Sequence, residues 1–400
     1  MKKTHKISYP IRIVYITTVP RSFNQLRGHL RYLGEQGFDI HCISSPGPEL
    51  DIVAQRENVQ IHPVLMHRSI SPLHDLLTII KIVLILIKLK PSIVHAGTPK
   101  GGFLGIIAAV LAGIPIRIYY ILGFRYIGMK SWKRSVVYLA DKIACLLANK
   151  IYCVSHSLHS LSTKLNLCPH SKISVRLNGS LNGVDAKERF NPKKLAGEGE
   201  SIRKEICIPQ NAIVIGFMGR IVKDKGFVEL VQAWKQIRNK ISNVHMLIVG
   251  PYELGDPVPL DVRNILESDS HIHLMGWVLN QDPYYAAMDI YVLPSYREGF
   301  PTTTLEAAAM ELPVVATKIP GCIDSVVNGV TGTLVEVKDS VDLASALINY
   351  CENQKLRIEH GLNGRKRVLS DYQPEAIWEL MVDEYFSMLE RRNKYSRVIV

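Results

Sequence analysis

The chain has 400 residues, more than a single hydrophobic core usually organises, so two domains of about 180–200 residues are expected. Its composition, 47% hydrophobic and 21% charged, is that of an ordinary globular protein without a low-complexity tract. The net charge of +12 is concentrated in residues 1–190, which hold 25 Lys and Arg against 9 Asp and Glu, whereas residues 191–400 hold 23 against 27.

The basic excess of the first half suits an anionic partner: nucleic acid, a phospholipid surface or a phosphorylated substrate. A solubilising surface without a partner remains open. Nucleic acid is disfavoured, because no zinc-finger spacing, aromatic RNA-binding run or basic-region heptad accompanies the charge. The seven cysteines are scattered without a C-x-x-C pair, which indicates reduced thiols in a cytosol rather than disulfides or a zinc site.

The first half alternates short β-rich runs with longer helical patterns. Strands are predicted at residues 11–17, 39–44, 91–97, 114–121 and 150–155, and helices at residues 101–112 and 131–148, among others. The first run is short and contains Arg12, which favours a strand over a signal peptide. Strands separated by helices of this length imply parallel βαβ units with right-handed crossovers.

The longest apolar stretch is LLTIIKIVLILI at residues 76–87, interrupted by Lys81 and followed by Lys88 and Lys90. It is shorter than the roughly twenty residues that a bilayer span needs. Because it is apolar nearly all round, it is either a buried helix or a helix lying in a membrane interface. A core helix is the commoner outcome at this length and is the interpretation preferred here, although the surrounding positive charge adds weight to the interface.

A loop-rich segment at residues 177–201, with two Asn-Gly pairs and a Pro, predicts turns and an interdomain linker. Strand patterns return at residues 212–219, 245–250, 271–278, 289–295 and 312–317, and residues 374–392 predict an amphipathic helix. The expected fold class is α/β, with two Rossmann-like, doubly wound parallel sheets. The first domain is expected at residues 1–185, the second at 205–372, and residues 373–400 as a helix packing back toward the first. Ligands of such sheets lie beyond the carboxyl ends of the strands, so a substrate is expected in a cleft between the two domains.

The strand at residues 212–219 ends in Gly219-Arg220, and Lys225-Gly226 opens the next helix. A glycine lets the backbone come close to a ligand, and two cations beyond a strand end can bracket a diphosphate. Cations placed there would also stabilise charge on a departing diphosphate. On its own the pattern is weak, because Lys and Arg in such loops are usually solvated.

A second motif lies in SYREGFPTTTLEAAAMELPVVAT at residues 295–317. Glu298 is expected just before a helix and Glu306 about one turn inside it, with Thr302 or Thr303 as N-cap. The free N–H groups of that first turn form an anion site for a phosphate. Glu306 could then take two ribose hydroxyls and Glu298 the hydroxyls of a sugar. The alternative is a capped helix with a surface Glu at each end.

These two motifs, GRIVKDKG followed by REGFPTTTLEA, resemble the C-terminal half of glycosyltransferase family 4, retaining enzymes with the two-Rossmann GT-B fold. The spacing of Glu298 and Glu306 matches the Glu-x7-Glu motif of that family. PSIVHAGTPKGGFLG, IYYILGFRY and NKIYCVSHSL are similar to segments of its capsule and O-antigen glycosyltransferases, and NGSLNGVD resembles their interdomain connection. The resemblance extends over nearly the whole chain.

The resemblance implies roles for individual residues. Arg220 and Lys225 would hold the donor diphosphate and stabilise it as leaving group, and Glu298 would contact the donor sugar as the third catalytic residue. The implied donor-binding residues are Gly219, Gly250, Val278, Gly299, Phe300, Pro301, Thr302, Leu305 and Glu306, with Glu306 on the ribose. No D-x-D pair occurs, which agrees with a fold in which cations and a helix N-terminus replace a Mg²⁺ ion, so neither metal nor cofactor is expected.

Two departures from the family pattern bear on the chemistry. Leu122 stands where relatives often have a His that contacts the donor sugar, and Gly97 stands where a second His is common. The expected acceptor side then rests on Arg21, His95 and Arg125, although a structural His is an equally good interpretation of His95. The pattern favours a front-face retaining mechanism, in which a leaving-group phosphate oxygen accepts the proton of the acceptor.

The resemblance thus predicts a hexosyltransferase that moves a sugar from a nucleoside diphosphate sugar, expected to be UDP-linked, to a saccharide acceptor with retention. The implied acceptor is free or linked to polyprenyl diphosphate, in cell-surface polysaccharide biosynthesis. The expected location is cytoplasmic, peripheral on the anionic inner face of the membrane. A sugar-nucleotide epimerase of the same fold and an inactive sugar- or partner-binding relative are the alternatives.

Overall fold

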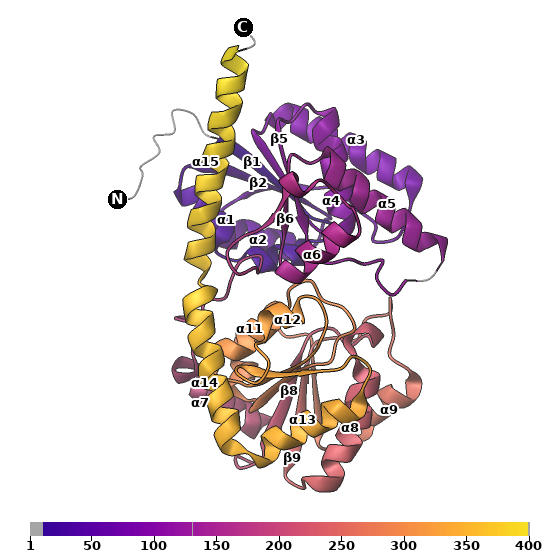
Figure 1. The fold of residues 1–400 in the computed structure, drawn as a ribbon, viewed down its shortest axis with the longest axis vertical. Coiled ribbons are helices and arrows are strands. Elements are labelled where there is room, and N and C mark those ends of the chain that lie inside the picture. The colour runs from indigo at the N-terminus through magenta and orange to yellow at the C-terminus, as the bar shows by residue number, and fades with distance from the viewer. Residues whose placement is uncertain (1–10, 130, 399–400) are drawn as a thin grey trace. The chain divides into compact units, whose positions relative to one another are not determined.

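The computed structural model describes residues 11–129 and 131–398, with side chains described as far as residue 392. The chain divides into two compact units. The first unit comprises the residues up to Asn182 together with the helix that starts at Pro374, and the second unit is Gly183–Gln373. Each unit is a parallel sheet covered by helices (Figure 1), so the predicted fold class is confirmed.

The first unit contains a seven-stranded parallel sheet in the order β3-β2-β1-β4-β5-β6-β7. Its strands are β1 (Ile11–Ile16), β2 (Phe38–Ser44), β3 (Gln60–Pro63), β4 (Ile93–Ala96), β5 (Ile116–Ile121), β6 (Lys150–Cys153) and β7 (Ile173–Val175). Its helices are α1 (His29–Glu35), α2 (Pro48–Glu57), α3 (Pro72–Leu89), α4 (Pro99–Leu111), α5 (Trp132–Leu147), α6 (His156–Lys164) and α15 (Pro374–Val398), with the 3-10 turns η1 (Pro20–Leu26) and η2 (His170–Lys172).

The second unit contains a six-stranded parallel sheet in the order β10-β9-β8-β11-β12-β13. Its strands are β8 (Ile213–Met218), β9 (Val244–Val249), β10 (Ile272–Gly276), β11 (Ile290–Leu293), β12 (Val314–Thr317) and β13 (Gly332–Val335). Its helices are α7 (Pro192–Glu205), α8 (Phe227–Lys240), α9 (Leu260–Ser268), α10 (Asp282–Ala286), α11 (Thr302–Ala309), α12 (Cys322–Ser325), α13 (Ser340–Glu352) and α14 (Gln354–Asp371), with the 3-10 turn η3 (Lys223–Lys225).

Each sheet has one point where the strand order reverses. In the first unit the chain builds outward from β1 to β3 and then returns to place β4 on the other side of β1. In the second unit the same reversal lies between β8 and β11. Loops diverge at such a switch point and leave room for a ligand beyond the carboxyl ends of the strands. The topology therefore marks one candidate site in each unit.

The C-terminal helix α15 completes the core of the first unit. Tyr15 of β1 and Tyr385 of α15, 370 positions apart, share a hydrogen bond of 2.8 Å between their hydroxyls. Arg176 donates to Glu384 of α15 at 2.5 Å and is only 4% exposed. The predicted helix at residues 374–392 is present, and it belongs to the same compact unit as β1.

The expected linker is wrong over residues 192–201, because residues 192–205 form α7. Pro192 occupies the first helical turn and the Asn191 side chain caps it by accepting from Lys193. Gly199 packs so closely on Ala286 of α10 that a Cβ there would lie 2.5 Å from the Ala286 carbonyl oxygen. Composition alone indicated a loop, whereas tertiary packing fixes a helix.

The interpretation of residues 76–87 as a core helix is also wrong. The segment forms α3, which packs beside α4 on one face of the first sheet (Figure 1). Only Thr78, Ile82 and Leu86 are buried. Six of its large aliphatic side chains are at least 47% exposed, which a core helix would not allow.

Candidate functional site

Three glycines bring the strand ends of the second sheet close together. Gly219 and Gly250 follow β8 and β9 with φ of 148° and 145°, in a region that L side chains rarely adopt. A Cβ on Gly250 would overlap the Gly219 carbonyl, and Gly250 also forms a backbone bridge with Gly276 at the end of β10. Residues without side chains are therefore required for the carboxyl edge to pack this closely.

Lys225 and Glu298 meet at the switch point of the second sheet. Gly226 (φ 74°) lies so near Pro294 that a Cβ would overlap the Pro294 carbonyl, which sets the turn after β8 against the loop after β11. Lys225 Nζ then donates to Glu298 Oε1. The two side chains are 17% and 13% exposed, so the pair lies in partly dehydrated surroundings where charge interactions are strong.

Arg220 lies in the same loop but is paired elsewhere. Its guanidinium donates to Glu253, which follows β9, and its side chain is 45% exposed. Exposed ion pairs contribute little to stability, so an incoming phosphate could displace Glu253 at small cost. The structure thus joins Lys225 to Glu298 and leaves Arg220 with a different carboxylate.

The helix after Glu298 starts where the sequence predicts, but the predicted Thr302 or Thr303 cap is wrong. Pro301 is the N-cap of α11, with φ −73°, and forms no side-chain cap. Thr304 instead donates its hydroxyl to the Pro301 carbonyl at 2.6 Å. Because the N-cap side chain satisfies none of the first-turn N–H groups, that turn suits an anion.

Glu306 lies in the second turn of α11 and accepts a 2.7 Å hydrogen bond from the buried Tyr285 hydroxyl at Oε2. Burial raises the pKa of Glu306, and the nearby Arg189 guanidinium and the Tyr285 hydrogen bond offset part of that rise. Arg189 is held in turn by hydrogen bonds of 2.5 and 2.6 Å to Asp282. Within the described parts of the chain, Glu306 Oε1 receives no hydrogen bond, so one oxygen remains for a ligand.

The other residues expected to bind the donor occupy the same edge. Gly299 and Phe300 precede α11, and Gly321 (φ 85°) lies so close that a Cβ would overlap the Gly299 carbonyl. Val278 follows β10 and packs against the core. Leu305 is 1% exposed, so it can reach a ligand only through its backbone.

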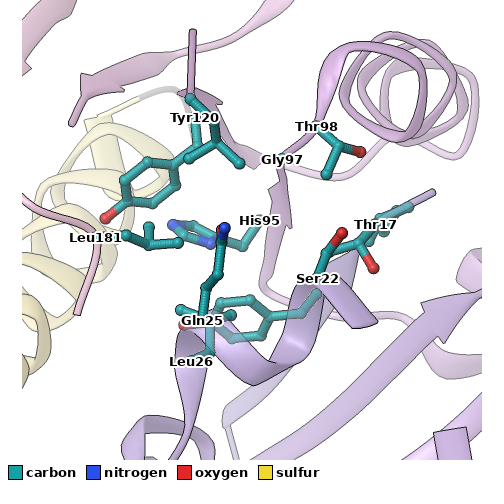
Figure 2. A pocket seen from close by; sticks show the side chains of 12 residues that line it. Thr17, Ser22, Gln25, Leu26, His95, Gly97, Thr98, Tyr120 and Leu181 are labelled. Atoms are coloured by element: carbon teal, nitrogen blue, oxygen red, sulfur yellow. The ribbon is translucent and has the colours of Figure 1, made fainter. Parts of the chain in front are cut away.

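The first unit has a cavity of about 340 Å³, including its open mouth, at the switch point between β1 and β4 (Figure 2). Its walls come from the ends of β1, β4 and β5 and from η1: Tyr15, Ile16, Thr17, Ser22, Gln25, Leu26, His95, Gly97, Thr98, Tyr120, Leu122 and Leu181. Leu122 and Gly97, the two departures from the family pattern, both line it. The cavity is therefore lined mainly by aliphatic and aromatic groups, with a few hydroxyls and one amide, and by no charged side chain.

His95 is the single imidazole among those lining residues. Its ring packs edge-on against Tyr15 and Tyr120, each with centroids 4.6 Å apart, and is 3% exposed. Burial holds the pKa of His95 well below its usual value, and the Arg176 charge lowers it further. His95 Nε2 has no hydrogen-bond partner in the described structure. A neutral ring with a free nitrogen can bind a hydroxyl but carries no positive charge.

Arg21 and Arg125, expected beside His95, do not line this cavity. Arg21 forms an ion pair of 3.7 Å with Glu49, and Arg125 donates to the Arg68 carbonyl at 3.4 Å. Both are on the surface because η1 and the loop after β5 turn their long polar side chains toward water. The structure brings only His95 of the three to the cavity.

Sequence reasoning missed Tyr285 and Arg189, which surround Glu306, and Tyr15 and Tyr120, which enclose His95. Each acts across a long sequence separation that no local motif records. For Tyr15 and Tyr120 the available signal was a polar aromatic residue within an otherwise aliphatic strand, because a buried Tyr usually needs a hydroxyl partner.

No group of three or more His, Cys, Asp or Glu in the described residues is placed to hold a metal ion. Among the described helices, none is both long and apolar enough to cross a bilayer.

Two protein families match the chain over its two units. Residues 12–155 match the family described as glycosyl transferase 4-like, and residues 212–353 match the family described as glycosyl transferases group 1. The capsular polysaccharide biosynthesis glycosyltransferase CapM of Staphylococcus aureus is 36% identical over 95% of this chain and 98% of its own length.

An Escherichia coli protein, UDP-Gal:alpha-D-GlcNAc-diphosphoundecaprenol alpha-1,3-galactosyltransferase, is 29% identical over 97% of this chain and 99% of its own length. HepE of Anabaena, solved in complex with UDP and glucose, aligns over 94% of this chain and all of its own with a TM-score of 0.78 at 17% identity. The two Rossmann-like units define a GT-B glycosyltransferase. The chain belongs to glycosyltransferase family 4.

Proposed function

We propose that this glycosyltransferase moves a sugar from a nucleoside diphosphate sugar, UDP-linked, to a saccharide carried on polyprenyl diphosphate, with retention, in capsule or related polysaccharide biosynthesis. The observation that carries the proposal is the Lys225–Glu298 pair in the loop just before α11, with Glu306 in the second turn of that helix. A cation, a free helix N-terminus and a carboxylate in that order fit a diphosphate followed by a ribose.

In the proposed reaction, the bond between the donor sugar carbon and the diphosphate oxygen breaks while the acceptor oxygen bonds to that carbon on the same face. The acceptor proton passes to the departing phosphate oxygen. Lys225, Arg220 and the N–H groups of α11 stabilise the charge on the diphosphate. Glu298, released from Lys225 when the phosphate binds, accepts hydrogen bonds from the sugar hydroxyls. Metal and cofactor are not needed in this scheme, and undiminished transfer in a chelator is the expected result.

The acceptor is proposed to enter the cavity of the first unit, with His95 and the hydroxyls of Thr17 and Ser22 around it. The low pKa of His95, set by burial, makes its ring a neutral hydrogen-bonding group rather than a charged acid. This supports the departing phosphate as the proton acceptor. The name of the Escherichia coli relative favours a lipid diphosphate acceptor. The basic excess of residues 1–190 favours a position at the inner face of the membrane.

Tyr285→Phe tests the placement of the ribose. Without the Tyr285 hydroxyl, Glu306 is less fixed and its pKa rises further, so donor KM should increase about tenfold with kcat nearly unchanged. The ionised carboxylate is the form that accepts ribose hydroxyls. Donor affinity is therefore lost as pH falls through the pKa of Glu306, and in the variant this loss should begin at a higher pH.

The measurement is donor KM as a function of pH for the wild type, for Tyr285→Phe and for Tyr284→Phe, the half-buried neighbour, as control. A 2′-deoxyribose donor should reduce the difference between wild type and Tyr285→Phe. Identical pH profiles for all three proteins would contradict the role given to Glu306.

The proposed function as a whole is tested with a panel of sugar nucleotides. The donor that most raises the temperature of unfolding is then incubated with polyprenyl-diphosphate-linked saccharides, and the anomeric configuration of the product is determined by NMR. Transfer with retained configuration is expected. A new sugar nucleotide formed from donor alone would indicate an epimerase, and binding without turnover on any acceptor would indicate an inactive relative; either result overturns the proposal.

A further inference from the structure

One face of α3 is apolar and uncovered. Its six large aliphatic side chains that are between 47% and 79% exposed all project from the same side of the helix: Leu73, Leu76, Leu77, Ile80, Leu84 and Ile87. The opposite side carries the buried Thr78, Ile82 and Leu86. The helix therefore exposes an aliphatic stripe on the side where a helix on a soluble protein usually carries polar residues.

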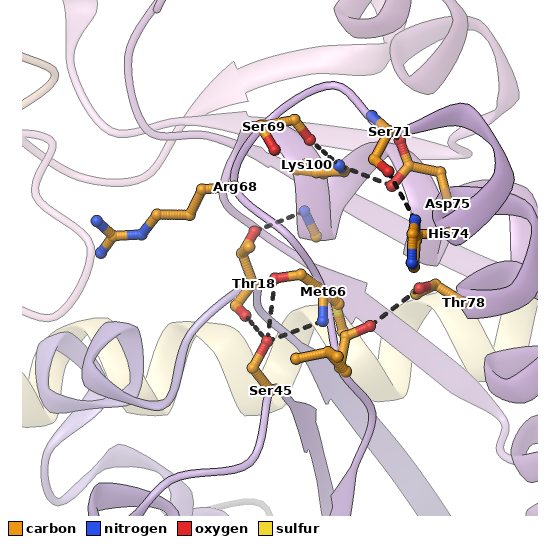
Figure 3. Close-up of polar contacts among 12 residues, drawn as sticks. Thr18, Ser45, Met66, Arg68, Ser69, Ser71, His74, Asp75, Thr78 and Lys100 are labelled. Atoms are coloured by element: carbon orange, nitrogen blue, oxygen red, sulfur yellow. Dashed lines mark hydrogen bonds and ion pairs between the residues drawn. The ribbon is translucent and has the colours of Figure 1, made fainter. Parts of the chain in front are cut away.

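The orientation of α3 is fixed by polar contacts at its N-terminal end (Figure 3). Thr78 donates its hydroxyl to the Leu65 carbonyl at 3.0 Å, and Lys100 of α4 pairs with Asp75 at 2.7 Å. The preceding loop is held by Ser45, whose hydroxyl accepts from the Met66 N–H at 2.9 Å. Turning the exposed side inward would break these contacts, so the outward face belongs to the fold.

Helix α5 continues the apolar surface. Trp132, Val136, Leu139 and Leu146 are between 39% and 65% exposed and recur at helical spacing on one side of α5. α4 packs between α3 and α5 on the same face of the sheet, and its exposed Val110 and Leu111 add to the surface. Together these residues of α3, α4 and α5 form what is called the apolar face below. A patch of this kind on a soluble domain marks an interaction site.

The charges around the apolar face are all positive. Lys81 and Lys88 lie seven residues apart along one side of the α3 stripe, and Lys133 flanks the stripe of α5 in its first turn. Between Glu57 and Asp185 the sequence has only two acidic residues, Asp75 and Asp141.

Neither of these carboxyl groups contributes negative charge to the face. Asp75 is paired with Lys100. Asp141 is 4% exposed and accepts from the Tyr119 hydroxyl at 3.0 Å, and burial raises the pKa of Asp141 to about 7. The apolar face is therefore bordered by cations without an exposed carboxylate on α3 or α5 within the described residues.

We propose that the apolar face is a docking surface for an anionic phospholipid bilayer, with α3 and α5 lying in the interface rather than across it. Aliphatic side chains and Trp132 would enter the acyl boundary, and Lys81, Lys88 and Lys133 would reach the phosphates. A second copy of the chain is a poorer occupant, since two such faces would bring like charges together.

The surface also determines where a lipid-linked acceptor would arrive. In a parallel βαβ unit each helix begins at the carboxyl edge of the sheet, so Leu73 and Trp132 lie toward the edge that carries the cavity around His95. Thr98, which lines that cavity, directly precedes α4. The delivery of a lipid-linked acceptor to this cavity rests on the proposed function, whereas bilayer docking itself rests only on α3, α4 and α5.

The test uses the full chain with vesicles of phosphatidylglycerol and phosphatidylcholine. The triple variant Leu77→Gln, Ile80→Gln and Leu84→Gln should weaken binding at least about tenfold, and Lys81→Gln with Lys88→Gln should weaken it and flatten its dependence on salt. The matched control is Ile358→Gln with Leu362→Gln, two aliphatic residues of α14 that are each 52% exposed. The control should bind like the wild type.

Folding and function are followed separately in the same proteins. UDP affinity and transfer to a soluble short-chain acceptor should be unchanged in the triple variant, while transfer to a vesicle-embedded acceptor should fall with vesicle binding. Equal vesicle binding by wild type and triple variant would overturn the docking proposal. A wild-type dimer that the triple variant dissociates, without vesicle binding, would identify a second copy as the occupant and overturn it too. Vesicle binding that depends on α3 in a protein without any transferase activity would leave docking standing and remove the proposed function.

Discussion

Replacing Lys225 with alanine is expected to lower kcat for sugar transfer by about a hundred- to a thousandfold, the usual loss when one group that stabilises developing charge is removed. The physical reason is the position of the ammonium, which is paired with Glu298 in the loop that leads into α11. Its pairing with Glu298 keeps it oriented before the substrate binds. When a diphosphate replaces Glu298 as partner, the same charge acts on the leaving group and frees the carboxylate for the sugar.

The matched control is Lys223→Ala, since Lys223 begins the same 3-10 turn but is exposed. Steady-state kinetics and thermal unfolding should be measured on both variants, and the effect of Lys225→Ala should fall on kcat more than on donor KM. A loss of less than tenfold in kcat with a normal temperature of unfolding would remove Lys225 from the proposed chemistry. A loss shared by both variants would mean that the turn itself, rather than the ammonium of Lys225, was damaged.

Glu384→Gln is expected to destabilise the first unit by about 3 kcal/mol, the lower end of the cost of leaving a buried charge without its partner. Arg176 is 4% exposed, donates to Glu384 at 2.5 Å and lies 3.4 Å from the centroid of the Tyr152 ring. The amide keeps the shape of Glu384 but removes its charge. Glu384 is itself 26% exposed, so water relieves part of the penalty.

For a unit of about 200 residues, this loss corresponds to a fall of about 6–12 °C in the temperature at which it unfolds. Calorimetry is the suitable measurement, because two units need not unfold together. Glu379→Gln is the control, an exposed carboxylate on the same helix, and should shift the transition by less than 2 °C, as a surface change usually does. An equally small shift for Glu384→Gln would mean that Tyr120 and Tyr152 alone hold the guanidinium in place.

The central strands were predictable because runs such as IRIVYI and IVIGFM are aliphatic, short and bounded by turn residues. The strands that the sequence did not reveal are β3, β7 and β13, each at a sheet edge. β3 has the sequence QIHP and no buried residue, and β7 has three residues. Such strands are formed by pairing with a neighbour, which a local pattern does not record.

The error over α3 has a different cause. A helix that is apolar nearly all round gives no sign of which side packs inward, so its length alone pointed to the core. What decides the side is the Asp75–Lys100 pair and the hydrogen bond from Thr78, both made to residues elsewhere in the chain. The same limit applies to the N-cap of α11. Thr is a preferred N-cap residue and three threonines follow one another there, but the N-cap is Pro301.

The candidate donor site was predictable to the extent that it is local. Gly219-Arg220 and Lys225-Gly226 flank one turn, and Glu298 and Glu306 flank the start of one helix. The partners of these residues were not, because Tyr285 reaches Glu306 from another helix and Glu253 reaches Arg220 from another strand end. Spacing along a chain finds the groups that touch a ligand, whereas the groups that orient them come from the tertiary structure.

The hydrogen bond between Tyr15 and Tyr385 has a consequence for biosynthesis. A ribosome makes β1 well before α15, with the whole second unit between them, so the nascent first unit lacks one wall of its core until α15 has emerged. The second unit is continuous in sequence and can close as soon as it emerges. We therefore expect the second unit to reach its native form before the first unit. Until then the first unit exposes apolar strands and depends on chaperones for longer.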